Sequence, residues 1–219
     1  MSKIHIYFMP GLAAGPEIFE RLELSSQIYE LHFLTWKTPL DLDETITNYA
    51  KRMTADIKHS NPVLIGVSFG GIIVQEMSKL IVTRKVIIIS SVKSTSELPK
   101  RYKIANKSKI YKLFPTQIVT NFDNYAKFFI GKSLEKKAKI YRKYLSVRGK
   151  NYIKWSIHNV INWSQDKPIE NIVHIHGTND HIFPLKNIEK CIKIEDGNHS
   201  MILLKPKEIS IIIHQSLTC

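Results

Sequence analysis

Residues 62–71 read Pro62-Val63-Leu64-Ile65-Gly66-Val67-Ser68-Phe69-Gly70-Gly71. An apolar run stops at Gly66, a lone serine follows at Ser68, and helix-like sequence begins after Gly71. Glycines two residues either side of a serine allow neighbouring backbone to pass close to a sharp turn. Such a turn lifts the hydroxyl above a sheet, at the positive end of the next helix. The pattern is that of a nucleophile elbow and predicts that the chemistry centres on Ser68 Oγ.

Strand and helix signals alternate along the first part of the chain. The predicted strands are the short apolar runs Ile4–Phe8, Tyr29–Trp36, Val63–Val67 and Lys85–Ser91. The predicted helices between them are Glu17–Leu22, Asp43–Lys58, with Asp43 as its N-cap, and Gly71–Val82. Short apolar strands separated by helices are typical of a parallel sheet that is covered on both faces.

This alternation stops near residue 93. Residues 94–166 are rich in Lys and aromatic residues, with helical stretches at Leu134–Leu145 and Tyr152–Ile161. Strand signals return at Ile172–His176 and Cys191–Glu195, and Lys207–Leu217 is a predicted helix. We therefore expect an α/β core of residues 1–93 and 167–219, with a mostly helical cap of residues 94–166 inserted in it.

Two loops supply candidate partners for Ser68. A serine nucleophile needs a base within hydrogen-bond reach, and that base needs an acid to orient it. His176-Gly177-Thr178-Asn179-Asp180 follows the fifth predicted strand, and Gly197-Asn198-His199-Ser200 follows the sixth. Both loops lie past carboxyl ends of parallel strands, where the sites of open sheets gather. His181 is a second candidate base, and Asp196 and Asp166 are further candidate acids.

The elbow, the acid loop, the histidine loop and the interposed cap together resemble the α/β-hydrolase family over nearly the whole chain. The resemblance implies the α/β-hydrolase fold, with about six mainly parallel strands in the order 2-1-3-4-5-6, flanked by helices. It makes Ser68 the nucleophile, His199 the general base and Asp180 the orienting acid. The backbone N–H groups of Leu12 and Phe69 would then form the oxyanion hole.

The resemblance also implies a reaction. It is that of a serine hydrolase, which cleaves a carboxylic ester or thioester through an acyl-enzyme and needs no cofactor or metal. A serine at the elbow argues against the haloalkane dehalogenases and epoxide hydrolases of the family, which carry aspartate there. Two alternatives stay open: a lyase or carbon–carbon-bond hydrolase that uses the same triad, and a non-catalytic ligand-binding protein of this fold.

Aromatic residues of the expected cap are candidate walls of an acyl pocket. Phe128, Phe129 and Trp155 are the candidates for contact with substrate, and Tyr125 and Trp163 lie in the same segment. The other interpretation is packing within the cap. Elsewhere, His174 and His176 share one face of a predicted strand. No carboxylate or cysteine pattern accompanies them, so we expect structural histidines and no metal site.

The formal net charge of +13 comes from one block of the chain. Residues 93–154 contain 17 Lys or Arg and three Asp or Glu. Such a block is either a solvated lysine face or a surface that attracts an anionic substrate, such as a CoA thioester. It resembles no nucleic-acid-binding module, so the expected partner is a small acyl ester or thioester and not a nucleic acid.

Three features predict a cytoplasmic protein. The sequence begins without a signal-peptide pattern, and its longest apolar runs are too short to span a bilayer. Its two cysteines, Cys191 and Cys219, do not form a disulfide framework. The sequence leaves the oligomeric state open.

Overall fold

A computed structural model describes residues 2–109 and 143–218. It contains a six-stranded parallel sheet with the order β2-β1-β3-β4-β5-β6. The strands are β1 (Ile4–Met9), β2 (Tyr29–Phe33), β3 (Val63–Val67), β4 (Lys85–Ile89), β5 (Ile172–Gly177) and β6 (Ile192–Ile194). The predicted parallel sheet and its strand order are confirmed.

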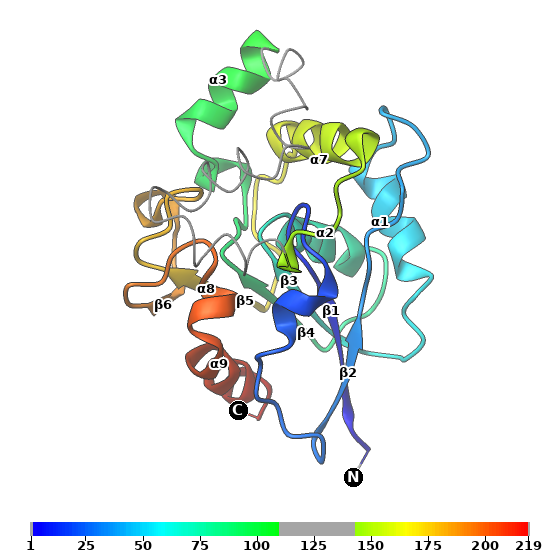
Figure 1. The fold of residues 1–219 in the computed structure, drawn as a ribbon, viewed down its shortest axis with the longest axis vertical. Helices are drawn as coiled ribbons and strands as arrows, with labels where there is room; N and C mark the ends of the chain where they lie inside the picture. The colour runs from blue at the N-terminus through cyan, green and yellow to red at the C-terminus, as the bar shows by residue number, and fades with distance from the viewer. Residues whose placement is uncertain (1, 110–142, 219) are drawn as a thin grey trace.

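Helices cover both faces of the sheet (Figure 1). One face carries α1 (Ile46–Thr54) and α2 (Phe69–Ser78); the other carries η1 (Pro16–Phe19), α8 (Met201–Leu204) and α9 (Pro206–Thr218). Each face has its own hydrophobic cluster. Successive strand residues point to opposite faces, so β1 contributes Tyr7 to the cluster under α1 and α2 and Phe8 to the cluster under η1, α8 and α9. None of the described helices combines the length and the apolarity that a bilayer-spanning segment needs.

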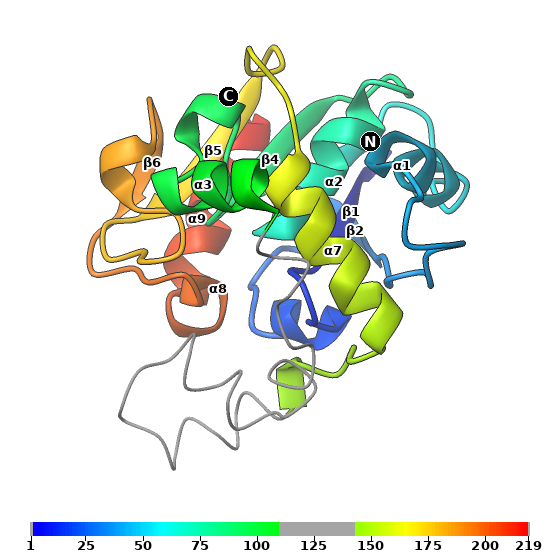
Figure 2. The ribbon, with the colours of Figure 1, turned by 90° about the horizontal axis from the view of Figure 1, so that it is seen from above.

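The helices α3 (Lys100–Ser108) and α7 (Lys150–Asn162) lie beyond the carboxyl ends of the strands, nearest the viewer in Figure 2. Short 3-10 turns, η2 (Thr95–Glu97) and η4 (Leu185–Asn187), complete the described elements. The prediction of a helix at Tyr152–Ile161 is confirmed by α7. The predicted helix Leu134–Leu145 lies largely outside the described residues, and its last residue, Leu145, is not helical.

Several predicted boundaries are wrong. The N-cap of α1 is Thr45, because its Oγ1 accepts a hydrogen bond from the backbone N–H of Asn48 at 3.2 Å. Asp43 precedes this cap, and its own N–H donates to Asp41 Oδ1 at 2.8 Å. The strands β2 and β4 also end before the predicted limits. Each polar side chain near a helix start can serve as a cap, and only the path of the chain decides which one does.

Candidate active site

Ser68 lies in the tight turn between β3 and α2, with backbone φ 53° and ψ −119°. Non-glycine residues rarely adopt a positive φ, which costs on the order of 1–3 kcal/mol. Two hydrogen bonds hold the turn in place. The Ser68 N–H donates to the Ile89 carbonyl at 2.9 Å, and Ser91 Oγ donates to the Ser68 carbonyl at 2.7 Å. The strand, sharp turn and helix of an elbow are therefore present.

Two glycines allow the turn to pack closely. A Cβ atom at Gly66 would overlap the backbone of Gly70. A Cβ atom at Gly70 would overlap the carbonyl oxygens of Met9 and Pro10. Backbone atoms cannot rotate away as a side chain could. The absence of side chains at these positions therefore brings the elbow against the loop that follows β1.

Replacing Gly70 with alanine is expected to lower the free energy of unfolding by about 3 kcal/mol, because the new methyl group would meet backbone oxygens. Gly149→Ala is the matched control, since its Cβ would make only an ordinary contact with Tyr152 at 3.8 Å. Gly149 is the N-cap of α7, where glycine is favoured over alanine, so we expect that control to lower stability by no more than about 1 kcal/mol. Urea unfolding followed by circular dichroism measures both; equal losses in the two variants would contradict the close-packing explanation.

The imidazole of His199 lies between Ser68 and Asp180. Its Nε2 is 2.9 Å from Ser68 Oγ, and its Nδ1 is 2.9 Å from Asp180 Oδ2. The three residues come from the loops that follow β3, β5 and β6, all at the carboxyl edge of the sheet. This is the spacing that a general base needs to take a proton from a hydroxyl while a carboxylate orients it.

The acid and histidine loops are bonded to each other. The Asn179 N–H donates to the Gly197 carbonyl at 2.8 Å, and the Thr178 N–H donates to the Ile194 carbonyl at 3.0 Å. The Asp196 N–H donates to Thr178 Oγ1 at 2.9 Å. These bonds hold the acid loop and the histidine loop together, and none of them involves a residue of the elbow.

Asp180 is buried, yet its surroundings favour the charged carboxylate. Its Oδ1 accepts the backbone N–H groups of Ile182 and Phe183 at 2.8 and 2.9 Å. Burial by itself would raise the pKa of Asp180, but the charge of His199 and the hydrogen bonds outweigh burial and lower that pKa. The group therefore stays ionised beside the imidazole.

The other candidate acids and base lie elsewhere. His181 is exposed, and its carbonyl accepts a hydrogen bond from Arg101 of α3 at 2.9 Å. Asp196 is exposed and accepts a hydrogen bond from Asn179 Nδ2 at 3.2 Å. Asp166 is also exposed. Of the three candidate acids, Asp180 is the one whose carboxylate contacts the His199 ring.

His174 and His176 form a buried pair behind Asp180. His174 Nε2 is 3.0 Å from His176 Nδ1, and His176 Nε2 is 2.8 Å from the Phe183 carbonyl. Burial lowers the pKa of both rings, even though Asp180 acts in the opposite direction on His176. His176 is 3.7 Å from Asp180 Oδ2. A neutral ring at this distance leaves the carboxylate charge available to His199.

The two predicted oxyanion donors border the same cavity as Ser68. Phe69 is the first residue of α2, where backbone N–H groups lack carbonyl partners within the helix. Trp36 holds the opposite loop: its Nε1 donates to the Gly11 carbonyl at 3.0 Å, next to Leu12. The same indole stacks on the Phe69 ring, with centroids 5.3 Å apart. One side chain thus supports both segments.

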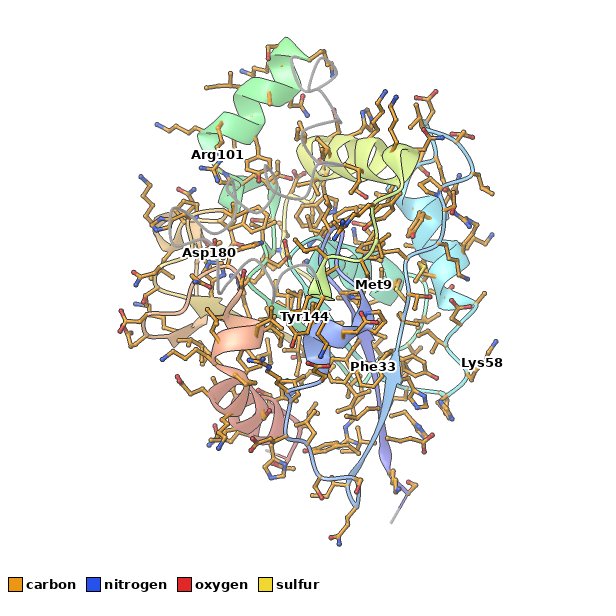
Figure 3. All side chains as sticks on the ribbon, in the orientation of Figure 1. Met9, Phe33, Lys58, Arg101, Tyr144 and Asp180 are labelled. Atoms are coloured by element: carbon orange, nitrogen blue, oxygen red, sulfur yellow. The ribbon has the colours of Figure 1, made fainter. Side chains whose placement is uncertain are left out.

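The cavity over Ser68 is mainly apolar, and its walls come from the core and from the segment between β4 and β5. It is lined by Gly11, Leu12, Ala14, Ile18, Val67, Ser68, Phe69, Tyr102, Tyr144, Leu145, Val160, Ile182, Phe183, His199, Ser200, Ile202 and Leu203. Tyr144, labelled in Figure 3, belongs to the hydrophobic cluster on the face of the sheet that carries η1, α8 and α9. An apolar wall next to a polar triad suits an uncharged acyl chain.

Of the three residues predicted to contact substrate, the structure describes Trp155 alone. Phe128 and Phe129, like Tyr125, lie outside the described residues. Trp155 is completely buried and does not line the cavity. Its Nε1 donates to the Glu44 carbonyl at 2.7 Å, and its ring packs on Tyr49. This placement favours packing, the other interpretation of this residue, over contact with substrate.

Sequence reasoning missed Tyr102, Tyr144 and Val160 as cavity residues. It also missed Arg101 of α3, whose guanidinium donates to the carbonyls of His181 and Ile182, directly after Asp180. No local pattern marks these positions, because their importance depends on how α3 and α7 lie over the sheet. A helical periodicity identifies an apolar face but not what that face covers.

Comparisons with known proteins agree on the fold. No protein-family model matches the sequence, and no curated protein matches it. An epoxide hydrolase from Bacillus megaterium superimposes with a TM-score of 0.74 at 14% identity, over 100% of this chain and 94% of the other. An esterase from Exiguobacterium antarcticum gives 0.69 at 15% identity, over 100% and 93%. An extracellular α/β-hydrolase from a Paenibacillus species gives 0.64 at 12%, over 97% and 98%. The protein therefore has the α/β-hydrolase fold.

Proposed function

We propose that this protein is a serine hydrolase that cleaves a carboxylic ester or thioester through an acyl-enzyme. One observation carries the proposal: His199 lies 2.9 Å from both Ser68 Oγ and Asp180 Oδ2. The strained elbow supports it, because a positive φ at Ser68 costs stability and serves to present the hydroxyl. We also propose that residues 94–166 form the cap over this site.

In the first half of the reaction, Ser68 Oγ attacks the acyl carbon while His199 Nε2 takes the hydroxyl proton. The carbonyl oxygen becomes an oxyanion, which the backbone N–H groups of Leu12 and Phe69 would stabilise. The bond to the leaving oxygen or sulfur then breaks, and His199 gives its proton to that atom. Asp180 stabilises the imidazolium throughout. The product is an acyl ester on Ser68 and a free alcohol or thiol.

In the second half, a water molecule occupies the place of the departed alcohol or thiol. His199 takes a proton from it as its oxygen attacks the acyl-enzyme, and the same N–H groups stabilise the second oxyanion. Collapse returns the proton to Ser68 Oγ and releases the carboxylic acid. Every proton is therefore moved by groups of this chain, the substrate or water.

A fluorophosphonate probe tests the nucleophile directly. We expect the wild-type protein to become labelled at Ser68, and p-nitrophenyl esters to produce an acyl adduct visible by intact-protein mass spectrometry. Ser78→Ala is a suitable control, since Ser78 lies at the far end of α2 and donates to the Gln75 carbonyl. Absence of both labelling and ester hydrolysis would overturn the proposal. Labelling of Ser68 without hydrolysis of any ester or thioester would instead support lyase or carbon–carbon-bond chemistry on the same triad.

The leaving group can be tested separately. We would compare p-nitrophenyl esters with acyl-CoA thioesters of the same acyl chains at low and high salt. A preference for the thioester that weakens with salt would assign the basic block at residues 93–154 to attraction of an anionic substrate. Equal efficiency at both salt concentrations would make that block a solvated lysine face.

A further inference from the structure

Four candidate metal ligands meet near the amino ends of β1 and β2, away from the triad. They are His5 on β1, Glu30 and His32 on β2, and His59 from the connection between α1 and β3. One ligand atom from each residue lies within 4.8 Å of those of the other three. Histidine and carboxylate together form a ligand set that divalent transition metals prefer.

The register of the first two strands explains this cluster. His5 is paired with Glu30, and Tyr7 with His32, in a parallel arrangement. Paired residues point to the same face of a sheet, and residues two apart on one strand share that face. His5, Glu30 and His32 therefore lie on one face of the sheet. His59 stacks on the His5 ring, with centroids 3.6 Å apart and an interplanar angle of 5°. An imidazole binds a metal in its ring plane, so the His5 ring must turn out of this stack before both rings bind the same ion.

The spacing of the ligand atoms fits a tetrahedral ion. Zinc-to-ligand bonds of about 2.0–2.1 Å give ligand-to-ligand distances of about 3.3 Å in a tetrahedron. The distance from His5 Nδ1 to His32 Nε2 is 3.1 Å. Glu30 carboxylate oxygens lie 3.7 Å from that His5 atom and 3.6 Å from that His32 atom. These two distances are to different oxygens of Glu30, Oε2 for His5 and Oε1 for His32. A rotation of the carboxylate is therefore needed to place one oxygen on a face of such a tetrahedron with the two nitrogens.

A second layer of contacts fixes the fourth ligand. The Tyr7 hydroxyl lies 2.7 Å from His59 Nδ1, and it accepts the backbone N–H of Lys58 at 3.0 Å. Metal-binding histidines almost always have their other ring nitrogen held in this way. The contact with Tyr7 therefore orients the His59 ring, and its Nε2 is the atom that can bind a metal.

The cluster is also accessible from solvent. The side chains of His5 and His32 are 25% and 23% exposed, and that of Glu30 is 48% exposed. An ion can therefore enter without unfolding the sheet. Lys58, next to His59, lies on the opposite side of the molecule from Asp180 in Figure 3. Occupation of the cluster would thus act on the fold and not on the reacting atoms.

We propose that His5, Glu30, His32 and His59 bind one Zn²⁺ ion in a four-coordinate site. The ion would join the edge strand β2 to β1 and to the end of the α1–β3 connection. Zinc suits three imidazoles and one carboxylate, whereas Mg²⁺ and Ca²⁺ prefer oxygen ligands alone. With four protein ligands the site is of the structural kind, which stabilises the fold.

The test uses tag-free, full-length protein that has been stripped of metal with a chelator. We expect one Zn²⁺ per chain in a competition titration against a chromophoric chelator, with a rise in Tm. Co²⁺ in place of Zn²⁺ should give the intense visible absorption of tetrahedral coordination. His32→Ala and His59→Ala should each weaken Zn²⁺ binding by at least about 100-fold and abolish that absorption.

His214→Gln is the matched control. Its Nδ1 lies 2.7 Å from the Tyr29 hydroxyl, so it makes the same contact as His59 with Tyr7, but outside the cluster. It should bind Zn²⁺ as the wild type does, and circular dichroism of the stripped variants checks that each is folded. The proposal is overturned if stripped protein binds no Zn²⁺, or if His32→Ala and His59→Ala bind it as tightly as His214→Gln. The short distance from His5 to His32 would then be a simple hydrogen bond.

Discussion

Ser68→Ala is expected to lower kcat for p-nitrophenyl ester hydrolysis by about 10⁵- to 10⁶-fold. The substitution removes the atom that forms the acyl bond, and His199 then has no hydroxyl from which to take a proton. The remaining activity would come from the oxyanion donors and from water. Alanine can take the same backbone conformation, with the same strain, so the Tm should stay close to that of the wild type.

Steady-state kinetics with single-turnover controls measure this loss. Ser78→Ala should keep wild-type kcat and KM, because its hydroxyl bonds only within α2. A Ser68→Ala variant that is folded and retains more than a small fraction of the activity would show that another group attacks the ester.

Asp180→Asn is expected to lower kcat by about 10⁴-fold with little change in KM. An asparagine in this place can still accept the backbone N–H groups of Ile182 and Phe183. Its amide would, however, donate to His199 Nδ1 and force the proton onto Nε2. That tautomer cannot accept the proton of Ser68. Asp196→Asn is the matched control, since Asp196 lies on the neighbouring loop and contacts Asn179 instead.

The same substitution changes how stability depends on pH. The pKa of Asp180 is lowered in the folded protein, so its ionisation stabilises the fold above the unfolded-state pKa of about 3.9. That stabilisation is lost as pH falls through the lowered pKa. The difference in unfolding free energy between the wild type and Asp180→Asn should therefore be constant above about pH 5 and shrink below about pH 4. Urea unfolding across this range measures it, and a difference that grows with acidity would contradict the assignment.

The sheet could be predicted from sequence because its signals are local. Val63–Val67 is apolar throughout, as expected of a strand buried on both faces, and a glycine-bounded serine follows it. The acid and histidine loops could be found for a related reason. Each follows a strand, and parallel strands bring their carboxyl ends to one edge. Local pattern and topology therefore predict the two loops, and the resemblance to the α/β-hydrolase family selects Asp180 and His199 within them.

The residues that the sequence did not reveal depend on long-range packing. Trp155 reads as a candidate pocket wall, but its indole donates to Glu44, far away in the sequence. The cluster of His5, Glu30, His32 and His59 is spread over two strands and a connection, with no metal-binding motif. The β1–β2 register brings His5, Glu30 and His32 together, and the connection between α1 and β3 adds His59. Spacing along the chain cannot report such pairings.

The bonds between the loops after β5 and β6 have a consequence for how the triad could be lost. The acid and the base are carried by one continuous segment, residues 172–200, whose own hydrogen bonds hold them together. The backbone of Ser68 is placed beside them by the pairing of β3, β4 and β5, and its hydroxyl contacts His199 directly. Loosening of the central strands would therefore separate nucleophile from base while leaving the Asp180–His199 pair assembled. Mild denaturant should therefore abolish activity before the hydrogen bond between Asp180 and His199 is lost.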